Sequence, residues 1–320
     1  MAVTKLSTSG LVSFAKYRSL LAGNAKAYFG GVAGYVAGGY DGSNVATVDK
    51  FAFPSDSRTT LGTGLSVARR ALAGMSNSGV AGYAAGGTTG SRVTTVDKFA
   101  FPSDSRTTLG TGISAGADNA VGISNSGTAG YVAGGYDGGR SNTVDKFAFP
   151  SDSRTTLGTG LSVGRNSLAG MQNQAVAGYA AGGDSGSRQS IVDKFAFPSD
   201  SRTTLGTGLS SARSFLAGMS NSGVAGYAAG GYDGSNVATV DKFAFPSDSR
   251  TTLGTGLSSS RTKVSGFSNA GNAGYIAGGD DGSTVDTVDK FAFPSDSRTT
   301  LGTGLSSSRE SAAGFANEAA

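Results

Sequence analysis

The chain of 320 residues contains neither His nor Cys, which excludes a histidine general base, a Ser-His or Cys-His nucleophile pair, disulfides and thiolate metal sites. Four of its 26 basic residues lie in residues 1–32, where there is no acid, which leaves 22 basic against 22 acidic residues elsewhere. A neutral body of this kind lacks the basic face of a nucleic-acid-binding domain. No apolar run approaches the ~18 residues that cross a membrane, and the first residues lack the apolar core of a signal peptide. We therefore expect no nucleic-acid partner, no membrane insertion and no secretion signal.

The chain beyond residue 32 consists of six copies of one unit. The stretch VDKFAFPSDSRTTLGTG, residues 48–64, occurs six times without a substitution. The first Phe of each copy falls at Phe51, Phe99, Phe147, Phe195, Phe243 and Phe291, at a constant interval of 48 residues. A fixed period of about this size indicates a repeat architecture. We therefore predict a basic N-terminal extension, residues 1–32, and one repeat domain, residues 33–320.

Each unit is predicted to contain four short strands. In the unit that starts at Ala33 they are residues 33–37, which end at a double Gly, residues 47–53, residues 59–65, and a segment around residues 72–75 that ends at Asn77. A turn is expected at Pro54-Ser55-Asp56, because Pro presets φ and Asp caps its own backbone. Four strands in about 50 residues are typical of a β-propeller blade. The fold expected is all-β with six blades, in which small residues lie near the axis and Phe51 and Phe53 pack between blades.

The ends of the repeat domain predict how the ring closes. The last segment, SRESAAGFAN at residues 308–317, matches SRTKVSGFSN at residues 260–269, which is an inner-strand segment. The repeats thus begin at a second strand and end on a first strand. We predict that the C-terminal strand completes the blade begun at Ala33, since closure protects strand edges. A linear solenoid is the alternative, although its polar caps are not visible. The segment RSLLAG at residues 18–23 resembles a rival inner strand, so the extension either packs on the ring or anchors it elsewhere.

Motifs that suggest chemistry are better explained as turns. Gly183-Asp184-Ser185-Gly186 resembles the nucleophile string of trypsin-like proteases, but the chain has no His to activate it. Asp280-Asp281-Gly282 lacks the alternating acids of a calcium loop. We therefore predict no catalytic residue, no metal site and no cofactor.

The pattern within one unit resembles the kelch repeat. A strand with a double Gly at residues 38–39, the aromatics Phe51 and Phe53, and Arg69 before the next inner strand carry the resemblance, although the kelch Trp is absent. The strings AGYAAGG and VDKFAFPSDSRTTLGTGLS more closely resemble kelch-like repeat proteins of tailed phages that infect marine cyanobacteria. This resemblance implies a six-bladed kelch-like propeller and a virion protein assembled in the host cytoplasm.

The resemblance also implies a binding face. In kelch proteins, the loop after the double Gly and the loop before the inner strand share a ligand-binding face. The matching residues are Tyr40, Tyr136 and Tyr232 from the first loop and Arg69, Arg165, Arg213, Arg261 and Arg309 from the second. Ala117 interrupts the arginine series in one unit. Tyr and Arg are frequent binding anchors.

The function expected is a non-enzymatic virion structural or attachment protein at the tail, fibre or capsid surface. Its partners would be other virion proteins, reached through the N-terminal extension, and a host surface glycan or protein. Two alternatives stay open. One is a glycan-processing hydrolase on a propeller, which would need an Arg cluster, a Tyr and a carboxylate pair. The other is an intracellular kelch-like adaptor. The sequence leaves the ligand, the host, the position in the virion and the oligomeric state undetermined.

Overall fold

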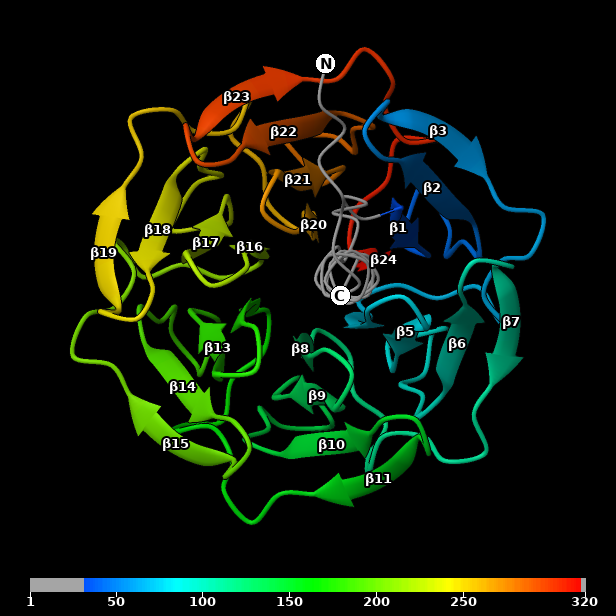
Figure 1. Ribbon diagram of the computed structural model, residues 1–320, viewed down its shortest axis with the longest axis horizontal. Helices are drawn as coiled ribbons and strands as arrows, with labels where there is room; N and C mark the ends of the chain where they lie inside the picture. The colour runs from blue at the N-terminus through cyan, green and yellow to red at the C-terminus, as the bar shows by residue number, and fades with distance from the viewer. Residues whose placement is uncertain (1–31, 318–320) are drawn as a thin grey trace, which may run out of the picture.

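The computed structural model describes residues 32–317 and is a ring of six antiparallel sheets around a central axis (Figure 1). Each sheet has four strands, so the predicted all-β propeller with six blades is confirmed. We number the blades along the chain: blade 1 is β24-β1-β2-β3, blade 2 is β4 to β7, blade 3 is β8 to β11, blade 4 is β12 to β15, blade 5 is β16 to β19 and blade 6 is β20 to β23. Residues 32–317 contain no helix, and therefore none long and apolar enough to cross a membrane.

The strands form four layers from the axis outward. The innermost strands are β24 (Ala313–Asn317), β4 (Ala73–Asn77), β8 (Val121–Asn125), β12 (Ala169–Asn173), β16 (Ala217–Asn221) and β20 (Ser265–Asn269). The second strands are β1 (Ala33–Ala37), β5 (Ala81–Ala85), β9 (Ala129–Ala133), β13 (Ala177–Ala181), β17 (Ala225–Ala229) and β21 (Ala273–Ala277). The third strands are β2 (Val48–Ala52), β6 (Val96–Ala100), β10 (Val144–Ala148), β14 (Val192–Ala196), β18 (Val240–Ala244) and β22 (Val288–Ala292). The outer strands are β3 (Ser57–Thr60), β7 (Ser105–Thr108), β11 (Ser153–Thr156), β15 (Ser201–Thr204), β19 (Ser249–Thr252) and β23 (Ser297–Thr300).

The C-terminal strand closes the ring, as predicted. Strand β24 pairs antiparallel with β1, with Asn317 opposite Ala33 and Ala313 opposite Ala37. The first blade is therefore assembled from both ends of the repeat domain, and no blade lacks an inner strand. The extension predicted at residues 1–32, with its rival strand at residues 18–23, lies outside the described residues apart from its last residue.

The outer strand is shorter than the sequence pattern predicted. It spans Ser57–Thr60 and not residues 59–65. The chain leaves the sheet at Gly62 and Gly64, and Leu65 turns inward, where it is 6% exposed. A Cβ on Gly64 would lie 2.4 Å from the carbonyl oxygen of Ala46, so the close approach that redirects the chain requires Gly there. The alternation of Leu61 and Leu65 therefore reflects a loop that packs under the blade.

The invariant residues join one blade to the next. Phe101 at the end of β6 stacks on Tyr35 of blade 1, with ring centroids 5.2 Å apart. Asp104, in the turn of blade 2, accepts a hydrogen bond from the Tyr35 hydroxyl at 2.7 Å and one from Lys50 Nζ at 2.6 Å. Equivalent contacts recur at all six boundaries, including Tyr275 and Lys290 with Asp56 across the closure. The structure thus confirms the predicted position of the Phe pairs and explains why Lys50, Phe53 and Asp56 are invariant.

The axis is narrow because every inner strand carries Gly at the same height. A Cβ on Gly122 would lie 1.8 Å from the carbonyl oxygen of Gly74, and a Cβ on Gly74 would lie 2.0 Å from that of Gly314. No side chain fits between the inner strands at this level. This close packing confirms the expectation of small residues near the axis.

Candidate binding site at the mouth of the central channel

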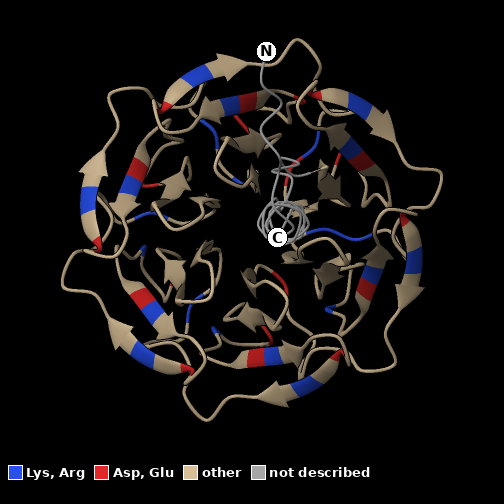
Figure 2. Ribbon diagram, viewed as in Figure 1, with Lys and Arg blue, Asp and Glu red and all other residues tan. Residues whose placement is uncertain are grey.

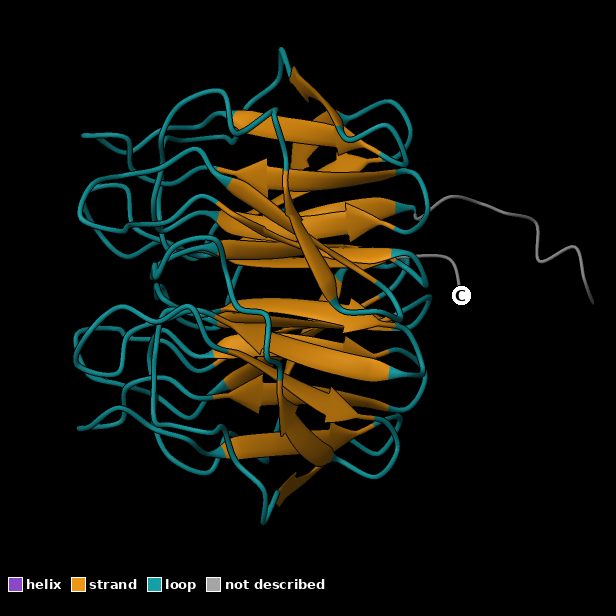
Figure 3. Ribbon diagram, turned by 90° about the vertical axis from the view of Figure 1, so that its left-hand side faces the viewer, coloured by secondary structure: helices purple, strands orange, loops and turns teal. Residues whose placement is uncertain are grey.

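The two faces of the ring differ in their connections. Loops 38–47 and 61–72 and their equivalents extend from one face, which we call the loop face (Figure 3). The short turns of residues 53–56 and 78–80 and their equivalents lie on the opposite face, where β1 begins and β24 ends. Side chains for a ligand on the loop face therefore come from every blade.

Differences between the units are greatest next to the axis on the loop face. One position of the unit holds six different residues: Arg70, Asp118, Asn166, Ser214, Thr262 and Glu310. The next position holds Ala71, Asn119, Ser167, Phe215, Lys263 and Ser311. These twelve residues form what we call the mouth. The mouth contrasts with the 17 invariant residues 48–64 and equivalents, which build the blade boundaries.

A circle of backbone hydrogen bonds holds the mouth open. Ala71 N–H donates to Ser311 C=O at 2.7 Å, Asn119 N–H donates to Ala71 C=O at 2.9 Å, and the series continues until Ser311 N–H donates to Lys263 C=O at 2.8 Å. All six residues have φ between 54° and 60°. Only backbone atoms make this circle, so it tolerates residues as different as Ala71 and Phe215.

Each of the six most variable residues precedes an inner strand and also pairs with the loop that follows the second strand of the same blade. Glu310 and Tyr40 exchange backbone hydrogen bonds at 2.9 and 3.0 Å, and equivalent bridges recur around the ring. These bridges place Tyr40, Thr88, Tyr136, Asp184, Tyr232 and Asp280 around the mouth. The expected tyrosines therefore lie at equivalent places on the loop face.

The mouth contains a cavity of about 360 Å³ with mixed aromatic and charged walls. Lys263 Nζ lies 2.9 Å from Glu310 Oε2, which is largely buried. The Arg70 guanidinium lies 4.6 Å from the centre of the Tyr40 ring. Phe215, in the loop that precedes β16 of blade 5, contributes a partly exposed ring. The cavity thus offers apolar ring faces beside charged donors and acceptors.

The other two predicted tyrosines are also covered by guanidinium groups. Arg92 lies 4.4 Å from the centre of the Tyr136 ring, and Arg188 lies 5.0 Å from that of Tyr232. Of the three tyrosines, only Tyr40 lines the mouth cavity. The stacking arginines were not predicted. Their signal in the sequence is that they occupy positions where the units differ.

The five predicted arginines lie elsewhere. Arg69 Nη1 lies 2.9 Å from Asp97 Oδ2, and Arg69 Nε donates to Gly86 C=O at 2.9 Å. Arg165, Arg213, Arg261 and Arg309 form the equivalent ion pairs with Asp193, Asp241, Asp289 and Asp49, although their Nε atoms have no hydrogen-bond partner. All five arginine side chains are fully enclosed. The structure thus gives them a role in blade packing and not at the ligand-accessible mouth, because each guanidinium neutralises a buried carboxylate.

Charged residues recur at equivalent places in every blade (Figure 2). Burial alone would raise the pKa of Asp97, but hydrogen bonds from Ser66 and Thr108 and the charge of Arg69 hold that pKa below its ordinary value. The pKa values of Asp49, Asp193 and Asp241 are lowered in the same way. These aspartates are therefore charged members of the core.

We expect the free energy of unfolding to be flat from about pH 5 to 9, because the chain has no His that titrates in this range. A lowered pKa in the fold means that Asp97 stabilises above its unfolded pKa of about 3.9, and this contribution is lost as the pH falls through the folded value. Burial and the hydrogen bond to Asp104 raise the pKa of Tyr35, so its contribution is lost as the pH rises above about 10. Melting temperatures followed by circular dichroism from pH 2 to 11 test this. A decline between pH 5 and 8 would contradict it.

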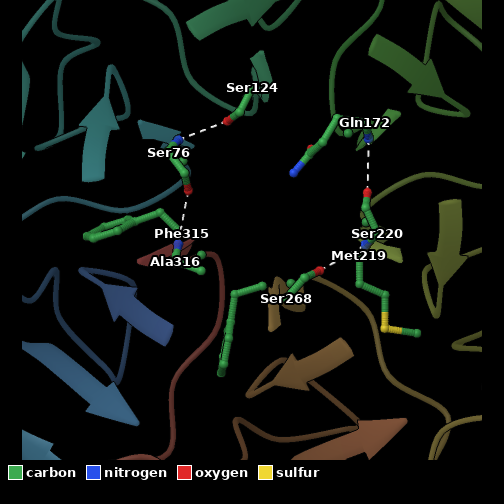
Figure 4. Close-up of a pocket in the computed structure, with 15 residues that line it drawn as sticks. Ser76, Ser124, Gln172, Met219, Ser220, Ser268, Phe315 and Ala316 are labelled. Carbon is green, nitrogen blue, oxygen red and sulfur yellow. Dashed lines mark hydrogen bonds between the residues drawn. The ribbon is translucent and has the colours of Figure 1, made fainter. Parts of the chain in front are cut away.

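The opposite end of the channel is less suited to a variable ligand. Its cavity of about 50 Å³ is lined by inner-strand residues that hydrogen-bond to one another (Figure 4). Ser76 N–H donates to Ser124 Oγ at 2.8 Å, and Ala316 N–H donates to Ser76 Oγ at 3.0 Å. Four of the six units carry Ser at this position, which indicates a structural role. Within residues 32–317, no group of acidic side chains is placed to hold a metal ion.

Comparison with known proteins supports the fold. No family model and no curated protein matches the sequence. A solved structure titled "Structure of YjhT" is similar, with a TM-score of 0.65 and 16% sequence identity over 83% of this chain and 96% of that chain. The chain is a six-bladed β-propeller. At this identity the likeness concerns architecture, so the function must be argued from the mouth.

Proposed function

We propose that this propeller is a non-enzymatic binding scaffold that presents the mouth to a ligand on a host surface. The observation that carries the proposal is the position that holds six different residues on an otherwise repeated unit, located where a cavity of about 360 Å³ opens. The boundary residues Lys50, Phe53 and Asp56 are identical in every unit. Side chains that differ in every unit are instead suited to fitting one asymmetric ligand.

A host surface glycan is the ligand that the mouth fits best. The cavity volume lies within the range of about 300–1,000 Å³ of ordinary ligand pockets. Tyr40 and Phe215 offer apolar ring faces for a sugar, and Arg70, Lys263 and Glu310 offer donors and acceptors for its hydroxyl groups. A glycan would thus contact both the aromatic rings and the charged side chains that line the cavity.

The setting that we propose is a phage virion. The support is the resemblance of the repeated strings to kelch-like repeat proteins of tailed phages. The structure adds an orientation, because β1 begins on the face opposite the mouth (Figure 3). A ring attached to other virion proteins at that end would direct its mouth outward. Mass spectrometry of purified virions tests this setting, and absence of the protein from particles would refute it.

Replacing mouth residues with those of sister units should abolish binding without affecting the fold. In the triple variant Arg70→Ser, Phe215→Ser and Lys263→Ser, each new Ser matches a residue already present at that position in another unit, as at Ser214 and Ser167. Loss of an anchor residue costs about 2 kcal/mol or more, so we expect affinity for the bound glycan to fall at least about 30-fold. A glycan array followed by titration calorimetry measures it.

The matched control changes the opposite face. Val80, Val176 and Val224 are each about half exposed there, and Thr128 occupies the equivalent position in another unit. The variant Val80→Thr, Val176→Thr and Val224→Thr should bind like the parent protein. Equal binding by the mouth variant would refute the site, whereas binding of a host envelope protein and no glycan would refute the ligand class.

A glycan-processing hydrolase is the second candidate. Two carboxylates, Asp118 and Glu310, line the cavity together with Tyr40 and Arg70, and hydrolysis of a glycosidic bond uses a pair of carboxylates. Against this candidate, Lys263 already holds Glu310 in an ion pair at 2.9 Å. Release of sugar from a bound glycan by the parent protein, lost in Glu310→Gln, would favour the hydrolase.

A further inference from the structure

Blade 3 has a buried carboxylate but lacks the arginine that its sister blades place beside it. Ala117 stands where the other units carry Arg, and Asp145 on β10 is nevertheless 3% exposed. The aspartates of the other five blades all pair with an enclosed guanidinium. Five blades of the ring therefore show the buried aspartate with its arginine, and blade 3 shows the same aspartate without one.

The occupied blades show how the site holds a guanidinium group. In blade 2, Arg69 Nη1 donates to Asp97 Oδ2 at 2.9 Å, Nε donates to Gly86 C=O at 2.9 Å and Nη2 donates to Ala84 C=O at 3.1 Å. One carboxylate and two carbonyl groups therefore surround the cation in blade 2. In blades 1, 4 and 5 a second-strand carbonyl group accepts from Nη2, in blade 6 Gly278 and Thr287 C=O accept from Nη1, and the Nε of these four arginines has no hydrogen-bond partner. The equivalent acceptors in blade 3 are Asp145, Gly134 and Val132.

These acceptors line a cavity in blade 3. Its volume is about 20 Å³, which holds one water, since one water needs roughly 10–15 Å³. A guanidinium group is larger, so it would displace this water and move the exposed outer wall. Val132, Gly134 and Asp145 form its inner wall, and the exposed residues Ala115 and Asp137 form its outer wall. The cavity is therefore reached from the loop face.

The other contacts of Asp145 leave the place of the enclosed arginine empty. Ser114 donates through N–H and Oγ at 2.6 and 2.8 Å, Thr156 Oγ1 donates at 2.6 Å, and Arg154 Nη1 donates at 3.4 Å to Oδ1 from the outer side. In blade 2 the same set of donors surrounds Asp97 and the enclosed arginine is present as well.

The surroundings add a second negative charge. Asp137 occupies the unit position that Asp233 and Asp281 hold in blades 5 and 6, beside their enclosed arginines. Blade 3 thus retains both acids of a guanidinium site and lacks only the cation. Opposite charge and planar donor geometry together favour guanidinium over a point charge such as ammonium.

We propose that the cavity between Ala117 and Asp145 is a binding site for a guanidinium group supplied from outside the chain. The guanidinium would donate to Asp145 Oδ2 and to the carbonyl groups of Val132 and Gly134. The group belongs either to a small molecule or to an arginine side chain of another protein. The site is separate from the mouth and does not depend on the function proposed for it.

Titration calorimetry with agmatine, a dication with a guanidinium group at one end and an ammonium group at the other, tests the proposal on the full chain. The parent protein should bind one equivalent. Ala117→Arg supplies the guanidinium internally, as in the sister blades, and should weaken agmatine binding at least about tenfold. Arg213→Ala recreates the same pair of acids, Asp241 and Asp233, and should raise the stoichiometry to two.

Three further measurements keep the result interpretable. Asp145→Asn should also lose binding, and this variant provides the test if Arg213→Ala does not fold. Putrescine, which carries an ammonium group at both ends and the same charge as agmatine, should bind at least about tenfold more weakly than agmatine. A peptide with an internal Arg that binds as tightly as agmatine would identify a protein side chain as the source, whereas binding of agmatine alone would identify a small molecule. No binding by the parent protein would mean a water-filled cavity only, and equal binding by Ala117→Arg would mean that agmatine binds elsewhere; either result would overturn the proposal.

Discussion

Removal of residues 309–320 is expected to unfold the ring or drive it to aggregate. The deletion removes β24, so that β1 loses its inner neighbour over Ala33–Ala37 and blade 1 exposes a strand edge at the axis. It also removes Arg309, the partner of buried Asp49, and the buried ring of Phe315. Breaking a buried ion pair alone costs about 3–5 kcal/mol, against a total stability of about 5–15 kcal/mol for a typical protein. Thermal melting and size-exclusion chromatography measure the result.

The control for this deletion is removal of residues 1–31, which takes away no described strand. We expect the shortened ring to melt at the same temperature as the full chain. If the extension anchors the ring in a virion, the shortened ring should keep its fold and fail to assemble. The reverse pattern, with collapse after the N-terminal deletion and an intact ring after the C-terminal one, would contradict closure by β24.

The double variant Phe147→Ala and Phe149→Ala should lose most of the stability of the ring. Phe147 is fully buried, and Phe149 is 8% exposed and stacks on Tyr83 of blade 2 at 5.1 Å. A core Phe→Ala change costs about 3–5 kcal/mol. The two rings share one cluster, so their costs do not add simply, and we expect a total loss of at least about 5 kcal/mol.

Urea denaturation of the double variant and of a matched control measures this loss. The control is Val163→Ser, since Val163 is 37% exposed and Ser211 occupies the same position in another unit. The control should unfold at the urea concentration of the parent protein. An unchanged midpoint for the double variant would mean that the two rings do not hold blades 2 and 3 together.

Most of the fold could be predicted because the repeat supplies six independent copies of each signal. The six copies of the Phe at a constant interval predicted six blades. The match between residues 260–269 and residues 308–317 predicted the closing strand. The outer strand was misjudged at Leu61 and Leu65, since their alternation is equally compatible with an edge strand and with a loop tucked under the blade. Only the contact of Gly64 with Ala46 decides between the two.

The site was harder to predict, as the neighbours Arg69 and Arg70 show. One is fully enclosed and the other reaches the mouth cavity. Their difference depends on Asp97, which lies 28 residues away from Arg69 and meets it only in the folded blade. The sequence nevertheless holds a usable signal: the enclosed arginine recurs in five units and the exposed one in a single unit. Here recurrence marks the arginine that the blade needs, and variation marks the one that reaches the mouth cavity.

The identity of residues 48–64 in all units also has a consequence for how such a ring changes over generations. Because every blade boundary uses the same residues, a genetic crossover between two copies of this block joins the loops of one unit to those of another in register. One crossover would thus exchange several mouth residues together. The circle of hydrogen bonds would remain, because only backbone atoms make it. A crossover that adds or removes a full unit would change the number of blades. One 48-residue repeat of the sequence therefore corresponds to one blade, so a gain or loss of one repeat is a gain or loss of one blade.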